Sequence, residues 1–265
     1  MKLYKLALLC GALLLALAAG GCNRLKARDH LNKGVQDYRS AQFQLAIMHF
    51  KEAVRLDPNL LNARLYLATA YAAQYVPSGE SPDNKKIAQD AIDSFHDVLQ
   101  RDPGNATALT FLSQIHYGLK DFDKAKEDNQ LRIKLEPNNP EPYYWIGMLD
   151  WLICFPRAQK IRNEHNIETP NKDGVLPVIP AKFRKDLAEE NGPLIDEGLK
   201  YLQKAIDLKP NDNQAMAYLN LMYRQKAEID EDDETREADL KTADDWVNKS
   251  LAALKAAGSG TSGAQ

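Results

Sequence analysis

A short sequence phrase recurs four times along the 265-residue chain, each time with a proline near its end. The copies occupy residues 55–59, 101–105, 134–138 and 207–211. Pro103 and Pro137 lie 34 residues apart, whereas the gaps from Pro58 to Pro103 and from Pro137 to Pro210 exceed 34 residues by 11 and by 39. A fixed period of this length is typical of stacked supersecondary units. We therefore expect a repeat protein with two insertions.

Small and aromatic residues recur inside the periods. The first period contains Gly34, Tyr38, Phe43, Ala46, Phe50 and Ala53 ahead of Pro58. Small residues let two helices approach closely, and an aromatic ring fills the space beside them. Proline ends a helix because it lacks an amide hydrogen and disfavours helix at the preceding residue. Each period thus predicts an antiparallel helix pair, which can bury its apolar face only against neighbouring pairs.

These residues and their spacing resemble the tetratricopeptide repeat (TPR). The resemblance implies an all-α fold, a right-handed superhelical solenoid of about five helical hairpins with a concave inner surface. The repeats would occupy residues 27–60, 61–105, 106–139, 140–212 and 213–257, within a domain at 29–257. Asn105, Asn139 and Asn213 are placed to cap the first helices of the last three repeats.

Two insertions and two polar segments interrupt or end this pattern. Residues 76–86 are rich in turn formers, which predicts an exposed loop. Residues 153–191 hold four prolines and two short helical possibilities, at 157–165 and 182–190, and could form either a flap that sets specificity or a structural cover. The acidic stretch 228–237 is expected to be a solvated linker, because calcium-loop spacing is missing, and residues 258–265 a flexible tail.

The resemblance implies that the first helix of each repeat lines the concave surface. Positions of this kind include Leu31, Val35, Leu65, Thr69, Thr110, Gln114 and Leu221. Aromatic residues, methionine and arginine often anchor binding surfaces, although tyrosine and tryptophan at helical spacing can equally belong to the core. The candidate partner-binding residues are Tyr38, Arg39, Tyr117, Tyr144, Met148, Trp151 and Arg224. The family's clamp for a terminal carboxylate is not expected, because Leu31 and Val35 occupy the positions of its Lys and Asn.

The amino terminus has the order basic, apolar, small that is typical of a secretory signal. Lys2 and Lys5 precede an apolar run at 6–19, which is too short to span a bilayer comfortably. Residues 17–22 resemble a bacterial lipobox, with Ala19 where leucine is usual. This resemblance implies removal of residues 1–21, acylation of Cys22, and a lipid-proximal linker at 22–28. Cleavage after Ala16 or Ala18 would instead make a secreted soluble protein.

Under the lipobox interpretation the protein is exported to the cell envelope and anchored on the periplasmic face of a membrane. Asn23 follows the cysteine where aspartate would mark retention at the inner membrane, so the outer membrane is favoured. Cys10 leaves with the signal, and Cys154 remains as a lone thiol, either a buried small hydrophobe or a reactive group. No disulfide within the chain is then available.

Charge and motifs exclude several classes of function. The chain has 34 Lys and Arg against 37 Asp and Glu, without the basic excess that nucleic-acid binding favours. The five histidines lack metal-ligand spacing, and no catalytic motif or phosphate loop occurs. We therefore expect no cofactor, metal or catalytic residue. Hydrolase activity would require perturbed acids or a metal gathered in one cleft.

Two functions remain. The first is a non-enzymatic scaffold, a lipid-anchored TPR protein that holds a segment of a protein partner in its concave groove, with envelope, pilus or secretion assembly as the candidate settings. The alternative is a small-ligand or glycan-binding envelope component that uses the 153–191 insertion as a flap. The sequence names neither the partner nor the ligand.

Overall fold

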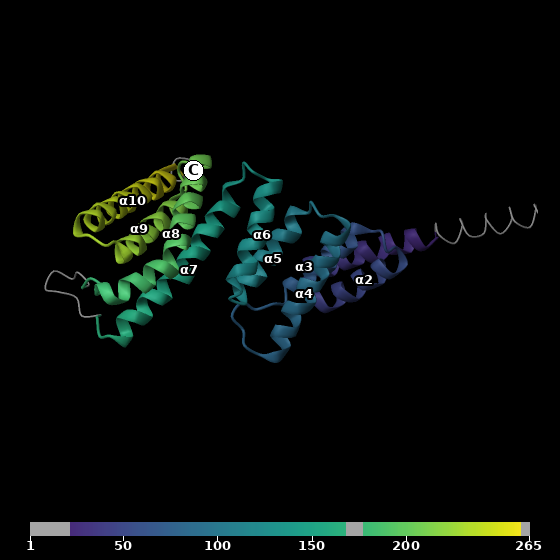
Figure 1. Ribbon diagram of the computed structural model, residues 1–265. Coiled ribbons are helices and arrows are strands. Elements are labelled where there is room, and N and C mark those ends of the chain that lie inside the picture. Colours follow the sequence, from purple (N-terminus) through teal and green to yellow (C-terminus); the bar gives the residue numbers. More distant parts are fainter. Residues whose placement is uncertain (1–21, 168–176, 261–265) are drawn as a thin grey trace, which may run out of the picture. The chain divides into compact units, whose positions relative to one another are not determined.

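The computed structural model describes residues 22–167 and 177–260, and all its regular elements there are α-helices (Figure 1). The chain divides into two compact units, residues 1–121 and 122–265. The boundary lies inside the third predicted repeat, between its two helices. The predicted signal at 1–21 and residues 261–265 of the predicted tail lie outside the described residues. The right-handed superhelical course of the whole chain stays a prediction.

The described part of unit 1 contains five helices in antiparallel order. The first includes residues 22–39; the others are α2 (Phe43–Leu56), α3 (Leu61–Ala72), α4 (Pro82–Arg101) and α5 (Ala106–Gly118). α3 packs against α2, α4 and α5. Residues 22–28 were predicted to be a linker, but they are helical. Ala27 is fully buried, so tertiary packing holds this turn in place.

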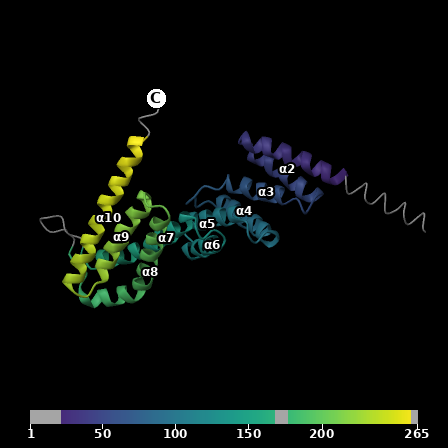
Figure 2. The same ribbon diagram turned by 90° about the horizontal axis from the view of Figure 1, so that it is seen from above.

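Unit 2 consists of α6 (Phe122–Leu135), α7 (Pro140–Glu164), α8 (Ala181–Leu208), α9 (Asn213–Ile229) and α10 (Asp233–Gly260). The helices α7 to α10 lie side by side, and α9 contacts α7, α8 and α10 (Figures 1 and 2). The predicted insertion is not separate from this bundle in its described part. Residues 153–164 continue α7 and residues 181–191 begin α8, in place of the two short helices expected there.

One backbone turn recurs after four of the second helices, and it explains the proline-anchored phrases. The amide of the residue two positions after each proline donates to the carbonyl of the residue before that proline. The pairs are Leu60 to Asp57, Asn105 to Asp102, Asn139 to Glu136 and Asp212 to Lys209, at 3.0 to 3.1 Å. Proline suits the second position of such a turn because its φ is already restrained.

The residue that completes this turn becomes the cap of the next helix. Asn105 Oδ1 accepts from the amide of Ala108 at 2.9 Å, and Asn139 Oδ1 from that of Glu141 at 3.0 Å, as predicted. The prediction for Asn213 is wrong, since Asp212 caps α9 by accepting from the amides of Gln214 and Ala215. The turn ends two residues after Pro210, and that position is occupied by aspartate.

Small residues let the helices of unit 1 meet closely. A Cβ atom at Gly34 would lie 2.5 Å from Cε1 of Phe50, so only glycine leaves room for this buried ring. Phe50 in turn stacks on Tyr66 of α3 at 5.5 Å between ring centroids. The first hairpin is therefore held to the second by an aromatic contact that depends on a glycine.

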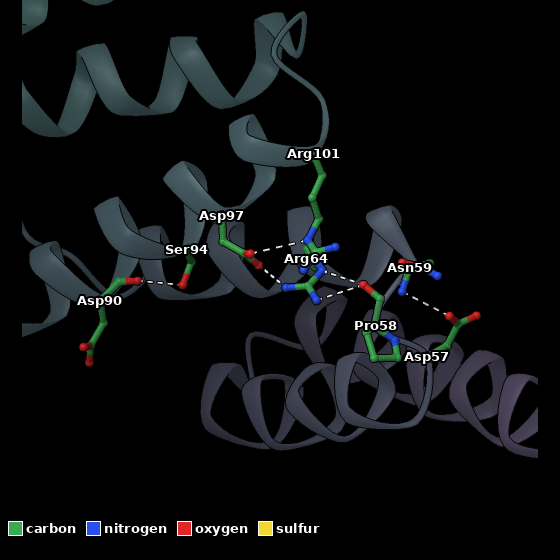
Figure 3. A network of polar contacts seen from close by, with 8 residues as sticks. All are labelled: Asp57, Pro58, Asn59, Arg64, Asp90, Ser94, Asp97 and Arg101. Carbon is green, nitrogen blue, oxygen red and sulfur yellow. Dashed lines mark hydrogen bonds and ion pairs between the residues drawn. The ribbon is translucent and has the colours of Figure 1, made fainter.

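A polar network joins the first turn to α4 (Figure 3). Arg64 of α3 donates from Nε and Nη2 to the carbonyl of Pro58 at 3.0 and 2.8 Å, and its Nη1 pairs with Asp97 of α4. Arg101 Nε lies 3.5 Å from the same carboxylate. One arginine thus ties the end of the first repeat to both helices of the second.

In the remaining segments, helix replaces expected loop. The segment predicted as a loop at 76–86 is a loop only up to Ser81, which caps α4, and residues 82–86 are helical. Most of the acidic stretch 228–237 is helical as well, because α9 runs to Ile229 and α10 begins at Asp233. α10 also includes residues 258–260, where a flexible tail was expected.

Candidate binding surfaces

A small groove in unit 1 gathers residues from the first helices of three successive repeats. Its volume is about 170 Å³. The helix at 22–39 contributes Tyr38, α3 contributes Thr69, and α5 contributes Phe111 and Gln114. The complete lining, which we call the unit 1 groove, is Tyr38, Thr69, Ala72, Ala73, Tyr75, Pro77, Phe111, Gln114 and Ile115. A surface shared by three repeats can contact several consecutive residues of an extended peptide.

Packing behind the groove holds its aromatic side chains in place. Phe111 stacks on the fully buried Phe95 of α4 with 5.1 Å between centroids and 10° between planes. Tyr38 meets the edge of Phe43 at 5.4 Å. Thr69 Oγ1 donates to the carbonyl of Leu65 at 2.7 Å. The groove is therefore largely preformed, which lowers the entropic cost of binding.

The loop after α3 forms one wall of the groove through Tyr75 and Pro77. Asn84, buried at the start of α4, organises this loop: its Nδ2 donates to the carbonyls of Val76 and Gly79 at 2.8 and 2.9 Å, and its Oδ1 accepts from the amide of Val76 at 2.8 Å. The amide of Ser78 donates to the carbonyl of Gly118 at 3.3 Å. The first insertion is thus an ordered part of the groove.

Unit 2 carries a row of aromatic side chains on α7 and α9. The ring of Tyr218 lies 5.7 Å from Tyr144 and 5.6 Å from Trp151, edge to face in both cases, and Trp151 stacks on Phe155 at 4.9 Å. All four side chains are half-buried. We call Tyr144, Trp151, Phe155 and Tyr218 the aromatic surface. α7 and α9 are the first helices of the fourth and fifth repeats, so this surface corresponds to the unit 1 groove in its position within the repeat.

A buried charged cluster lies in the same unit. Lys126 Nζ of α6 lies 2.5 Å from Oδ1 of Asp150 on α7 and 2.6 Å from Oε2 of Glu197 on α8. Burial raises the pKa of Asp150 to about 7, although Lys126 acts to lower it, and Oδ2 of Asp150 has no hydrogen-bond partner among the described residues. A perturbed acid can mark a catalytic site. Asp150 is 0% exposed, so a substrate could not reach it, and we interpret the cluster as structural.

The predicted site residues have different fates. Tyr38 lines the unit 1 groove, whereas Arg39 and Tyr117 are exposed but not part of its lining. Tyr144 and Trp151 come together in the aromatic surface. Met148 is only 6% exposed and accepts from the hydroxyl of Tyr144 at 3.7 Å, so it packs beneath that surface instead of lining it.

Arg224 is placed on a different face from the aromatic surface. Its Nη2 lies 2.6 Å from Asp244 of α10, and its Nε donates to Asn220 at 3.0 Å. Together with Pro177 and Val178 it lines a cavity of about 590 Å³. Tyr218 was missed by the sequence analysis, although it lies three residues before Leu221 and the helical period could have placed it on the same face.

Neither a metal site nor a membrane span is found in the part of the chain that the structure describes. There, no group of three or more His, Cys, Asp or Glu side chains is arranged to hold a metal ion. His30 and His49 come together across the first hairpin, with 3.0 Å between their Nδ1 atoms. None of the described helices is both long and apolar enough to cross a bilayer.

Comparison with known proteins agrees with the repeat geometry. A family model described as tetratricopeptide repeat matches residues 88–145, from α4 into α7. This chain therefore contains tetratricopeptide repeats. The TPR chain is 30% identical over 115 residues to the Hsp70-Hsp90 organizing protein of Triticum aestivum, covering 43% of this chain and 18% of that protein. It is 24% identical over 187 residues to the interferon-induced protein with tetratricopeptide repeats 2 of Cricetulus griseus, covering 71% of this chain and 32% of that protein.

The TPR chain therefore spans less than a third of the length of these curated relatives, between 18% and 32%. Among solved structures it is similar to the crystal structure of MamA protein, with a TM-score of 0.57 and 17% identity over 87% of this chain and 92% of that one. It is also similar to the crystal structure of YrrB, described as a TPR protein with an unusual peptide-binding site. The TM-score is 0.51 and the identity 17%, over 86% of this chain and 89% of that one. At these identities the likeness concerns the fold, which is all-helical and built of TPR-like hairpins.

Proposed function

We propose that this TPR protein is a non-enzymatic scaffold of the bacterial cell envelope that binds an extended segment of a partner protein along the first helices of its repeats. The unit 1 groove carries this proposal, because residues distant in sequence from three repeats meet at one preformed surface. Its volume of about 170 Å³ lies below the range of roughly 300 to 1,000 Å³ that is usual for small-molecule sites. It suits a single side chain of a peptide better than a whole ligand.

Peptide display tests the groove directly. A library of random dodecapeptides would be panned against the proposed mature chain, residues 22–265, and the recovered peptides measured by fluorescence anisotropy. Gln114→Ala removes an exposed polar group from the groove and should weaken binding at least tenfold. Gln89→Ala makes the same change on the exposed face of α4 and should leave affinity unchanged. Peptides that bind both variants equally well would remove the groove from the proposal.

The aromatic surface offers a second contact for the same partner. Half-buried aromatic rings supply large contact area at low entropic cost. A longer envelope-derived partner would be recovered by cross-linking and affinity capture. Trp151→Ala should then weaken the binding of this partner, while the affinity of the short peptides for the unit 1 groove stays constant. Capture that is insensitive to this change would confine the proposal to unit 1.

Lipid anchoring is the second part of the proposal. The lipobox-like segment supports it, and so does the exposed position of Cys22. Outer-membrane attachment on the periplasmic face is the proposed location. Mass spectrometry of the mature amino terminus tests it, because an acylated Cys22 is expected and an unmodified terminus elsewhere would indicate a secreted soluble protein.

A small-ligand function has one specific observation in its favour. The cavity of about 590 Å³ in unit 2 is large enough for a drug-sized molecule, and Pro177 and Val178 of the insertion contribute to its wall. Its arginines are already paired, Arg162 with Glu228, Arg224 with Asp244 and Arg236 with Asp233. This pairing makes it the weaker candidate. Thermal stabilisation by a ligand, lost on substitution Val178→Asp, would favour it.

A further inference from the structure

The first turns of the helix at 22–39 expose three cations. Arg24, Lys26 and Arg28 are exposed, and none forms an ion pair with a described residue. Asp29, the next residue along, is already held by Lys33, with 2.7 Å between Nζ and Oδ2. Leu25 lies among these cations and is 71% exposed, the largest value among the exposed large hydrophobic side chains of the described residues. The segment combines positive charge with an exposed apolar side chain.

Cys22 belongs to this same rigid segment. It is exposed and lies three residues before Leu25, so the two share one helix face. The buried Ala27 keeps the segment packed on the first repeat, so no flexible linker separates Cys22 from the fold. At about 1.5 Å of rise per residue, Arg28 lies only about 9 Å along the helix from Cys22. That is close to the Debye length of about 8 Å at physiological ionic strength.

We propose that residues 22–28 form a surface that binds the anionic phospholipid headgroups of a bilayer, with Leu25 entering the interface beside the acyl chains on Cys22. The inference rests on the lipid-anchoring part of the proposed function. Charge complementarity supports it: the chain from residue 22 onward has a net charge of −5, since it keeps 32 of the 34 Lys and Arg and all 37 Asp and Glu. An anionic surface therefore repels most of the protein, and this segment decides which end approaches the lipid.

The contribution of the three cations to membrane partitioning can be measured when the lipid anchor itself is weak. A cation close to an anionic bilayer adds about 1 kcal/mol, or about fivefold in partitioning, so three cations predict about 100-fold. A single acyl chain holds a protein only marginally, with a partition constant of about 10⁴ M⁻¹, which leaves this contribution visible. Native multiple acylation would hide it.

The experiment attaches a single alkyl chain to Cys22 by a chemical reaction. The proposed mature chain, which contains all the described helices, would be treated with N-tetradecylmaleimide. Cys22 is exposed and Cys154 is 0% exposed, so only Cys22 is modified. Partitioning is then compared between vesicles of phosphatidylcholine alone and vesicles in which about a third of the lipid is phosphatidylglycerol. We expect about 100-fold stronger partitioning to the anionic vesicles, lost in about 1 M salt.

Two triple variants complete the test. The combination Arg24→Gln, Lys26→Gln and Arg28→Gln should abolish the preference for anionic vesicles. The control combination Lys200→Gln, Lys204→Gln and Lys241→Gln removes three exposed lysines of unit 2 and should keep it. Equal partitioning of the unsubstituted protein to both vesicles, or equal loss in both variants, would overturn the proposal. An unmodified Cys22 in cells would instead contradict native lipid anchoring. A failure of the unsubstituted protein to bind any displayed peptide would contradict the scaffold function.

Discussion

Nη2 of Arg162 on α7 lies 2.7 Å from Oε1 and 2.5 Å from Oε2 of Glu228 on α9. Nη1 of the same guanidinium donates to the carbonyls of Ile167 and Pro177, which border the segment at 168–176. One side chain therefore closes the base of the insertion and attaches it to the fifth repeat. Burial raises the pKa of Glu228, and the neighbouring Arg162 opposes that rise.

Replacing Arg162 should destabilise unit 2 strongly. Arg162→Met leaves a half-buried carboxylate and two carbonyls without the donor that the buried guanidinium supplies, so we expect a loss of about 3 kcal/mol in the free energy of unfolding. Urea denaturation measures it. Lys160→Gln breaks only an exposed pair with Glu164, at 3.8 Å, and should change stability by less than about 0.5 kcal/mol. Similar losses in both variants would contradict a special role for Arg162.

The buried Asp150 should make stability depend on pH. Its pKa is raised from 3.8 to about 7, so the folded state holds this proton more tightly than the unfolded state. The stabilisation is complete below about pH 4 and is lost as pH rises through 7, an effect on the order of 3 kcal/mol. Denaturation between pH 4 and 8 should show this decline in the unsubstituted protein and a flatter profile in Asp150→Asn. Asp196→Asn, at an exposed position, should keep the original profile.

The close approach at Gly34 predicts a repairable defect. Gly34→Ala places a methyl group against the ring of Phe50 and should cost about 1 to 3 kcal/mol of stability. Phe50→Leu shortens the opposing side chain, so the double variant should lose less than the sum of the two single changes. A thermal denaturation cycle measures the difference. Asn32→Ala, at an exposed position of the same helix, should be neutral or slightly stabilising, and strict additivity in the cycle would refute the contact.

The two cysteines of the proposed mature chain should differ in reactivity. Cys154 is buried, and its burial raises its pKa to about 12, so little thiolate forms near neutral pH. A colorimetric thiol reagent should therefore modify Cys22 quickly and Cys154 only after denaturation. If both thiols reacted at the same rate under native conditions, Cys154 would be accessible.

Much of the fold could be predicted because TPR order is local. The proline turns, the caps at Asn105 and Asn139, and the meeting of Gly34 with Phe50 all depend on residues within one repeat or its neighbour. The cap at Asp212 was missed by one position, because the sequence offers Asn211, Asp212 and Asn213 together and only the turn hydrogen bond selects among them.

The binding residues were harder to predict, because a helical period assigns a side chain to a helix face but does not tell how deeply that side chain is buried. Tyr144 and Met148 lie one turn apart on α7, yet the methionine packs under the tyrosine. The loop wall at Tyr75 and Pro77 had no sequence signal, since its position depends on Asn84 and on the carbonyl of Gly118.

The sequence by itself determined the repeat length, the helical pairing and the places where helices end, because proline, glycine and capping residues act on the backbone within a few positions. Only the tertiary structure decided that residues 22–28 are helical, that the second insertion lengthens α7 and α8, and that Arg162 joins it to Glu228. These outcomes follow from burial and from charges brought together across the fold, and a residue's separation along the chain does not reveal which partner will share its buried space.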